Sequence, residues 1–232
     1  MKTLYLVATP IGNLNDFSPR GVEVLNKVDR IYAEDTRRTN VLLNHFGIKK
    51  PVASYFEQNE LKRIPEILLH LTNHDVALVS DAGTPTISDP GYKLVRSAIQ
   101  AGYIVISVPG PVAAVLALTS SGLPTDRFSF IGFLPKKDSA KRKVLEEVKS
   151  WRTTLIFYES PYRVRESLEA MLEILGDRPV SISRELTKLH EETRRGKLSQ
   201  MLSGWGPLKG EVTIVVGIKE DDVESLPPDP LA

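Results

Sequence analysis

The hydrophobic residues in the first half of the chain are grouped into five short, mostly apolar runs, at residues 4–8, 30–33, 52–54, 76–79 and 104–108. Short continuous runs of this kind are typical of strands that are buried on both faces of a parallel sheet. Between the runs, apolar residues recur at helical spacing, as in Val22, Leu25 and Val28. This alternation of strands and helices predicts a parallel sheet with helices on both faces.

Local signals predict where these helices begin. Ser18 followed by Pro19 is a favourable helix start, and Thr36 is a candidate N-cap for the next helix. We expect the third helix over residues 64–71, with a proline near its start, and the fourth from residue 88 or 89.

The pattern changes beyond a linker at residues 123–126. Strands are predicted at residues 128–134, 153–158, 180–183 and 212–218. Helices are predicted up to residue 150, up to residue 175 and over residues 198–202, whereas residues 184–197 form a polar, charged stretch with no predicted element. The order of these elements predicts a second α/β domain with a mixed sheet.

We therefore expect an α/β protein with two α/β domains. The N-terminal domain is predicted over residues 1–122 and the C-terminal domain over residues 123–219. Residues 220–232 are acidic and rich in proline, and they are predicted to be disordered.

Three strands of the first domain run into loops of glycine, proline and small polar residues. The longest follows the fourth strand at residues 80–91, and the others lie at residues 9–13 and 109–111. The carboxyl ends of parallel strands share one edge of the sheet, where such sheets bind ligands. Most strand-to-helix connections need only a few residues, so the length of the 80–91 loop favours a binding loop over an ordinary connection. Backbone N–H groups in such loops can hold a ligand with little steric hindrance.

Six sequence blocks follow one another along residues 1 to about 219: VATPIGNLND at 7–16, AEDTRRTNVLL at 33–43, SDAGTPTISDPG at 80–91, VPGPVAA at 108–114, FYESPYRV at 157–164 and SRELTKLHEE at 183–192. Together they resemble the ribosomal RNA small subunit methyltransferase I family, a branch of the tetrapyrrole methylase superfamily. The resemblance implies a class III methyltransferase fold with a cofactor cleft between the two domains. It also implies an S-adenosylmethionine-dependent enzyme that methylates the ribose 2′-hydroxyl of a cytidine in the decoding region of 16S ribosomal RNA.

The resemblance also implies which residues contact S-adenosylmethionine. They come from the three loops and from the second domain: Pro10, Gly12, Asp81, Gly83, Thr84, Ile87, Val112, Ala113 and Tyr158. Asp81 has a physical rationale as well, because its carboxylate would attract the sulfonium and ammonium groups of the cofactor. Alternatively, Asp81 only caps the following turn. Val112 stands where the family often has serine, which removes one potential hydroxyl contact.

Methylation of a hydroxyl group requires in-line placement of the oxygen and loss of its proton. Much of the rate can come from positioning, with modest help from a general base. Candidate proton acceptors or orienting groups are Glu159, Glu185 and Lys188. Lysine would serve only if burial or the nearby Arg184 lowered its pKa. Alternatively, residues 184–188 form a surface stretch of ion pairs.

The chain has a net charge of +1, with +5 in residues 111–219 and −5 in residues 220–232. A basic half can bind phosphates, although a solvated lysine-rich surface explains the charge equally well. The predicted RNA-binding cations are Arg37, Arg38, Lys136, Lys137, Arg163 and Arg184, with further support from Lys141, Arg142, Arg165, Arg194 and Arg195. Predicted stacking partners for bases are Tyr55, Phe56, Tyr158 and Tyr162. We place Arg37 and Arg38 away from the cofactor loops, where they either hold RNA phosphates or pair with Glu34 and Asp35.

Several classes of site have no support in the sequence. No dinucleotide-binding, Walker or nucleophile-elbow motif occurs, and His70 and His74 are interpreted as a solvent-facing pair, so no metal site is expected. The chain has no cysteine and no apolar run that is long enough to span a membrane, which is compatible with a cytoplasmic protein.

Two other functions remain open. One is a tetrapyrrole methyltransferase, and the other is a non-catalytic RNA- or ribosome-binding module. The AEDTRRT and RELTKLHEE blocks favour RNA, and the intact loops argue against a module without chemistry. The expected partners are small-subunit ribosomal RNA or the 30S subunit, and a second copy of the chain in a homodimer. Many members of the resembled family continue past this chain's end, so we expect a short or truncated form.

Overall fold

The computed structural model describes residues 2–203 and 209–219, so the predicted disordered tail at residues 220–232 lies outside the described residues. The chain divides into two compact units, residues 1–112 and 113–232. The sequence analysis placed this boundary after residue 122. The difference arises because helix α5 (Ala113–Thr119) packs against strands of the second unit and therefore belongs to it.

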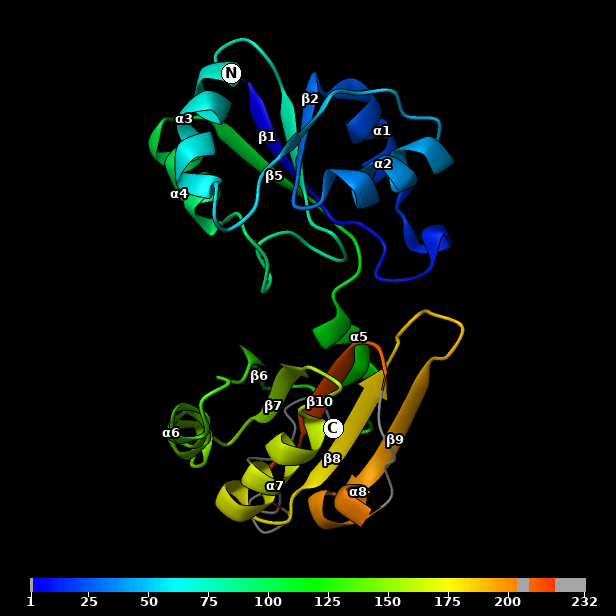
Figure 1. The fold of residues 1–232 in the computed structure, drawn as a ribbon, viewed down its shortest axis with the longest axis vertical. Helices are drawn as coiled ribbons and strands as arrows, with labels where there is room; N and C mark the ends of the chain where they lie inside the picture. Colours follow the sequence, from blue (N-terminus) through cyan, green and yellow to red (C-terminus); the bar gives the residue numbers. More distant parts are fainter. Residues whose placement is uncertain (1, 204–208, 220–232) are drawn as a thin grey trace. The chain divides into compact units, whose positions relative to one another are not determined.

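The first unit contains a five-stranded sheet in the order β3-β2-β4-β1-β5 (Figure 1). The strands are β1 (Thr3–Val7), β2 (Arg30–Ala33), β3 (Val52–Ser54), β4 (Val76–Val79) and β5 (Ile104–Val108). Every strand pair in this sheet is parallel, as predicted. The carboxyl ends of all its strands therefore lie at one edge.

Helices cover both faces of this sheet (Figure 1). They are η1 (Leu14–Asp16, a 3-10 turn), α1 (Pro19–Lys27), α2 (Thr36–His45), α3 (Glu60–His70) and α4 (Tyr92–Gln100). One buried cluster includes Leu25 of α1 and Leu43 of α2, and another includes Ile67 of α3 and Leu94 of α4. Each fully buried side chain of this size stabilises the fold by roughly 1.5–3 kcal/mol.

The starts of α1 and α2 follow local capping chemistry. Ser18 caps α1 as predicted, because its hydroxyl accepts a backbone N–H from the first turn, and Pro19 is the first helical residue. Helix α2 is capped by Asp35 and not by the predicted Thr36, because the Asp35 carboxylate accepts the N–H of Arg37.

The starts of α3 and α4 differ more from the prediction. Helix α3 begins at Glu60, so Pro65 lies inside it and not near its start. The preceding turn is closed by Asn59, whose side chain accepts the N–H of Phe56. Helix α4 begins at Tyr92 because the residues before it, with φ 61° at residue 88 and 136° at residue 91, cannot be part of a right-handed helix.

The second unit contains a mixed five-stranded sheet in the order β6-β7-β10-β8-β9, and its mixed character was predicted (Figure 1). The strands are β6 (Phe128–Phe133), β7 (Thr154–Glu159), β8 (Pro179–Arg184), β9 (Glu192–Lys197) and β10 (Val212–Val216). Strands β6 and β7 are parallel, whereas β10 is antiparallel to β7 and β8, and β8 is antiparallel to β9.

One face of this sheet is covered by α6 (Asp138–Val148), α7 (Val164–Leu175) and α8 (Leu198–Ser203). Leu145 of α6 and Leu168 of α7 are buried with Phe157 of β7 in a single cluster. The next residue, Tyr158, points to the opposite face, where its hydroxyl accepts the N–H of Ala114 in α5. Among the residues that the structure describes, no helix is long and apolar enough to cross a membrane.

Strand β9 was not predicted, because residues 184–197 read as a charged stretch. It pairs with β8 on one side only and is the edge strand of the sheet. Its sequence, ETRRGK, is charged and lacks the apolar alternation that marks a half-buried strand. Charged residues are a common feature of edge strands, where they discourage pairing with another chain.

Candidate functional site

The three loops predicted to bind a ligand are joined at the carboxyl edge of the first sheet. Thr9 and Gly83 exchange two backbone hydrogen bonds, with N···O distances of 2.9 and 3.0 Å. The Thr9 hydroxyl donates to the carbonyl of Ser80 at 3.1 Å, and the Thr84 hydroxyl donates to the carbonyl of Pro111 at 3.1 Å. The loops after β1, β4 and β5 therefore form one connected structure, which we call the loop surface (residues 8–13, 80–91 and 109–112).

Two glycines are required by the geometry of the loop surface. Gly83 has φ of 88°, a left-handed conformation that side chains with a Cβ adopt at a cost. At Gly110 the requirement is space, because a Cβ there would lie 2.6 Å from the Cβ of Ala8. The loops after β1 and β5 can approach this closely only because residue 110 has no side chain.

The backbone of the 80–91 loop is strained around Ile87. Thr86 and Ser88, on either side of it, have φ values of 76° and 61°, which are uncommon for residues other than glycine. The side chain of Ile87, a predicted cofactor contact, is 38% exposed between them. Strain of this kind is concentrated at functional sites, where the surrounding structure maintains it.

Asp81 connects the loop surface to the end of β2. Its Oδ1 accepts the N–H of Asp35 at 2.8 Å, and its Oδ2 lies 3.5 Å from the guanidinium of Arg38. The prediction that Arg38 lies away from the cofactor loops is therefore wrong. Arg37 instead pairs with Asp35 through two hydrogen bonds of 3.1 and 2.7 Å.

Sequence reasoning missed Glu34, which follows β2 directly. Burial raises the pKa of its carboxyl group, and the negative charge of Asp81 raises that pKa further. Asp81 and Glu34 are alike in position, because each is the first charged residue after a buried strand. A carboxyl group with a raised pKa at a ligand-binding edge is a candidate for proton transfer.

The loop surface contains most of the predicted cofactor residues: Pro10, Gly12, Asp81, Gly83, Thr84, Ile87 and Val112. The other two, Ala113 and Tyr158, belong to the second unit. There the Tyr158 hydroxyl accepts the N–H of Ala114 at 3.1 Å, which places it at the start of α5.

Glu159 is buried and fully engaged at the end of β7. Its side chain accepts hydrogen bonds from the Ser167 hydroxyl at 2.6 Å and from the N–H of Ser160 at 2.8 Å, and it pairs with Arg163 at 3.3 Å. Arg163 also donates to the carbonyl of Leu134 at 2.7 Å. A role of Glu159 as proton acceptor, or of Arg163 in binding RNA, would require these bonds to rearrange.

Glu185 and Lys188 form an ion pair at the turn between β8 and β9. The ammonium of Lys188 donates to carboxylate oxygens of Glu185 and Glu211, both at 2.9 Å. Burial alone would lower the pKa of Lys188, but these bonds outweigh burial and raise it. The condition under which Lys188 would act as a base, a lowered pKa, is therefore not met.

The predicted RNA-binding cations fall into two groups. Some are paired, such as Arg184 with Glu192 at 2.8 Å, and Lys141 is buried in α6. The other paired cations are Arg142 with Glu173, Arg165 with Glu169 and Arg194 with Glu192, while Arg195 donates to the carbonyl of Ser120. Lys136 and Lys137 are exposed, and no carboxylate among the described residues pairs with either.

The predicted stacking residues also differ in exposure. Tyr55 is 1% exposed and its hydroxyl donates to Glu60, so the prediction that it stacks on a base is wrong. Tyr162 is 89% exposed.

The histidine pair is not simply solvent-facing. The rings of His70 and His74 lie 5.2 Å apart, and His70 shares a hydrogen bond of 3.2 Å with the buried Tyr32. Burial lowers the pKa of His70. No group of residues suited to holding a metal ion occurs within residues 2–203 and 209–219.

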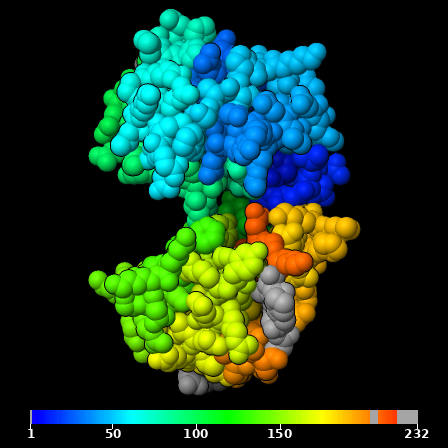
Figure 2. Space-filling model, viewed as in Figure 1, coloured from blue at the N-terminus to red at the C-terminus, as the bar shows by residue number. Residues whose placement is uncertain are grey.

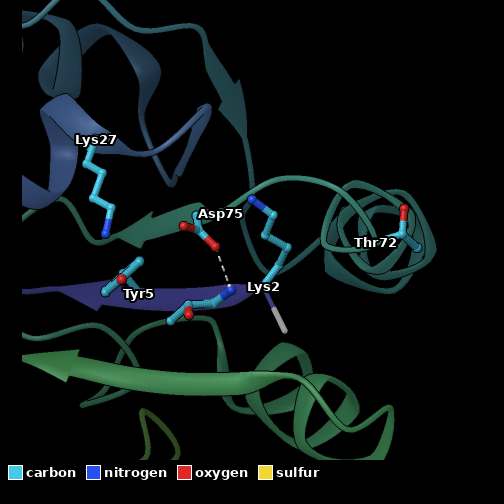
Figure 3. Close-up of a pocket in the computed structure, with 6 residues that line it drawn as sticks. Lys2, Tyr5, Lys27, Thr72 and Asp75 are labelled. Carbon is cyan, nitrogen blue, oxygen red and sulfur yellow. Dashed lines mark hydrogen bonds between the residues drawn. The ribbon is translucent and has the colours of Figure 1, made fainter.

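A shallow depression of about 560 Å³ lies at the opposite, amino-terminal edge of the first sheet (Figure 3). Lys2, Thr3 and Tyr5 line it from β1 and the residue before it, and Asp75 accepts the N–H of Thr3 at 2.9 Å. Its lining contains none of the predicted site residues. Ligands of parallel sheets bind at the carboxyl edge, so we do not assign the cofactor to this depression.

Comparison with known proteins covers most of the chain. The family model of the tetrapyrrole (corrin/porphyrin) methylases matches residues 3–202. The chain is 52% identical over 228 residues to the ribosomal RNA small subunit methyltransferase I of Halalkalibacterium halodurans, which covers 96% of this chain and 78% of that protein. It is 49% identical to the protein of the same name from Thermotoga maritima, over 95% of this chain and 100% of that protein. The corresponding protein of Escherichia coli O157:H7 is 45% identical, over 98% of this chain and 82% of that protein.

Proposed function

The chain belongs to the tetrapyrrole (corrin/porphyrin) methylase family, and we propose that it transfers a methyl group from S-adenosylmethionine to small-subunit ribosomal RNA. The proposal is carried by the connected loop surface at the carboxyl edge of the first sheet, together with the 45–52% identity to proteins named ribosomal RNA small subunit methyltransferase I. The acceptor we propose is the ribose 2′-hydroxyl of a cytidine.

The residues of the loop surface suit S-adenosylmethionine. Asp81 supplies a carboxylate with a side chain 23% exposed, and a carboxylate has about four lone-pair positions, more than Asp35 and Arg38 occupy. Gly83 permits the positive φ of its loop, and Gly110 permits the close approach of the loops after β1 and β5. When bound, the cofactor supplies a methyl group on a sulfonium. Asp81 is proposed to bind its cationic groups, and the loop backbone to orient it.

The chain's own residues must then place the hydroxyl and receive its proton. Among the earlier candidates, Lys188 is a charged ammonium with a raised pKa, so it suits donation to an oxygen or a phosphate better than proton acceptance. Glu159 and Glu185 remain candidates, although both are engaged in hydrogen bonds. We add Glu34, whose raised pKa brings it closer to the working range of a general base.

Binding of RNA is proposed to involve Arg38 together with the second unit. Arg38 is 67% exposed although it pairs with Asp81, so its outer N–H groups can still reach a phosphate. Lys136 and Lys137 are the exposed cations of the second unit that best suit this role. We also propose that the protein acts in the cytoplasm, on ribosomal RNA or the 30S subunit, and as a homodimer.

The decisive experiment incubates the protein with methyl-labelled S-adenosylmethionine and small ribosomal subunits. Label is expected in the RNA, in a dinucleotide that resists alkaline hydrolysis, because a 2′-O-methyl group blocks cleavage of the adjacent phosphodiester. Parallel reactions contain a porphyrinogen instead of RNA. Transfer only to the porphyrinogen would favour the tetrapyrrole methyltransferase, and RNA binding without transfer would favour the non-catalytic module.

A further inference from the structure

An aromatic cluster lies where β6 and β7 end in the second unit. The rings of Phe130 and Phe133 pack edge-on against Tyr158, with centroid distances of 4.9 and 5.5 Å. Phe133 is 58% exposed, whereas Phe130 and Tyr158 are partly buried behind it. An exposed aromatic ring supported by two others is suited to contact with a flat ligand.

A β-bulge produces this arrangement. The pairing of β6 with β7 shifts between Phe130 and Gly132, so Ile131 is an extra residue in β6. In a regular strand, residues three positions apart point to opposite faces of the sheet. The extra residue returns Phe133 to the face of Phe130, where it is the pairing partner of Tyr158. Bulges often re-aim side chains next to functional sites.

Two unpaired cations follow the cluster directly. Lys136 and Lys137 lie just beyond β6, both exposed, and they pair with no carboxylate in the part of the chain that the structure describes. In this they differ from Arg142 and Arg163, which are neutralised by neighbouring carboxylates. The green region that contains β6 forms part of the visible surface of the second unit (Figure 2).

We propose that Phe133 stacks on an unpaired base of the RNA substrate, supported by Phe130 and Tyr158, and that Lys136 and Lys137 bind the adjacent phosphates. The inference rests on the proposed function and names where that substrate is held. Single-stranded RNA is recognised by aromatic stacking combined with cations along its backbone. A second copy of the chain is a poorer occupant, because a two-fold axis through this patch would bring the unpaired lysines of both copies together.

The test measures binding of the full chain to a fluorescent ten-nucleotide single-stranded RNA, by anisotropy at several salt concentrations. The same chain length with abasic ribose at every position serves as the second probe. Phe133→Leu should weaken binding of the RNA roughly tenfold and leave the abasic probe unaffected, because only stacking is lost. Phe133→Trp should retain binding. The double variant Lys136→Ala, Lys137→Ala should weaken both probes and reduce the salt slope by roughly 0.7 per lost phosphate contact.

Trp151→Leu is the matched control. Trp151 is an aromatic residue that is 40% exposed, but it lies before the start of β7, at the other end of that strand. The proposal is overturned if Phe133→Leu binds the RNA as tightly as the wild type does. It is also overturned if Trp151→Leu loses as much RNA affinity as Phe133→Leu. A change in sedimentation of Phe133→Leu, with RNA binding intact, would assign the patch to a second copy instead.

Methyl transfer to small ribosomal subunits separates the two proposals. If the wild type methylates the RNA while Phe133→Leu binds and methylates normally, only the stacking proposal fails. If the wild type methylates no RNA, the proposed function fails on its own assay.

Discussion

Single residues of the loop surface are fixed by different physical constraints. Gly83 must adopt a positive φ, and Gly110 must leave room for Ala8. Asp81 must accept a hydrogen bond from the N–H of Asp35 while it pairs with Arg38. A substitution at one of these positions changes the backbone around the proposed cofactor site, so it affects more than a single ligand contact. Affinity and stability must therefore be measured on the same preparation.

Gly83→Val is expected to lose at least tenfold in affinity for S-adenosylmethionine, measured by calorimetry with a chelator present. A β-branched residue at φ of 88° is strained, and forcing a residue into the left-handed region costs about 1–2 kcal/mol. Gly102→Val is the matched control, because Gly102 has φ of 80° and follows α4 at the opposite edge of the sheet. A Cβ at this position would meet no atom of the described residues within 4 Å. Both variants should lose stability, but only the first should lose affinity. Unchanged affinity in a folded Gly83→Val variant would remove this loop from the site.

Glu34→Gln should lower the rate of methyl transfer by roughly 10²–10⁴ if Glu34 receives the proton, with little change in cofactor affinity. Because the pKa of Glu34 is raised above its ordinary 4.5, the wild-type rate should climb with pH through that raised value, and the variant should lack this limb. The raised pKa also means that the folded state binds this proton more tightly than the unfolded state. The contribution of protonated Glu34 to folding stability is therefore present below the ordinary pKa and is lost as pH rises through the raised pKa. Glu34→Gln should consequently be slightly more stable than the wild type at neutral pH.

Glu23→Gln provides the control for Glu34, because Glu23 is an exposed carboxylate in α1 and is not among the groups that shift the pKa of Glu34. Full activity and an unchanged pH profile in Glu34→Gln would exclude Glu34 as the proton acceptor.

At the scale of elements, the turn between β8 and β9 should show a pH-dependent stability. Hydrogen bonds from Lys188 and from the N–H of Glu211 overcome burial and lower the pKa of Glu185, while bonds to the two carboxylates raise the pKa of Lys188. The contribution of this ion pair to folding stability is therefore complete between the ordinary pKa values of its two groups, which are 4.5 for Glu185 and 10.5 for Lys188. It is lost as pH falls through the lowered pKa or rises through the raised one.

Lys188→Met should therefore melt at a lower temperature than the wild type at neutral pH, and the difference should shrink at both extremes. Melting curves at about pH 3, 7 and 12 test this, with Lys136→Met as a control, because Lys136 makes no ion pair within residues 2–203 and 209–219. A difference that is the same at every pH would contradict the ion-pair explanation.

The helices and strands differ in how well the sequence alone predicts them. Buried strands of the first unit were predicted because their apolar runs are local signals, whereas the edge strand β9 has no such signal. Asp81 is the first charged residue after a buried strand, and the same position in the pattern could have identified Glu34. The contact of Arg38 with Asp81 could not be predicted, because it depends on β2 and β4 being neighbours in the sheet. The start of α4 depends on the positive φ values at residues 88 and 91, which the sequence pattern does not reveal.

At the scale of the whole chain, each unit has its own sheet and its own buried clusters. The clusters of the first unit contain residues from β1 to β5, and the cluster of the second contains residues from β6 to β10. Each unit is within the size range of domains that fold alone. Most predicted cofactor residues lie in the first unit, and the proposed stacking residues lie in the second.

Separate expression of residues 1–112 and 113–232 should therefore give two fragments that each unfold cooperatively on heating. The first fragment retains the loop surface and should bind S-adenosylmethionine without any metal. The intact chain is expected to bind at the micromolar level, about −8 kcal/mol. The fragment should bind more weakly if Ala113 and Tyr158, which it lacks, contact the cofactor as predicted. Equal affinity in both would remove these two residues from the cofactor contacts. A fragment that melts cooperatively but does not bind S-adenosylmethionine would mean that the loop surface alone does not hold the cofactor. If the fragment does bind, introducing Gly83→Val should abolish the binding heat.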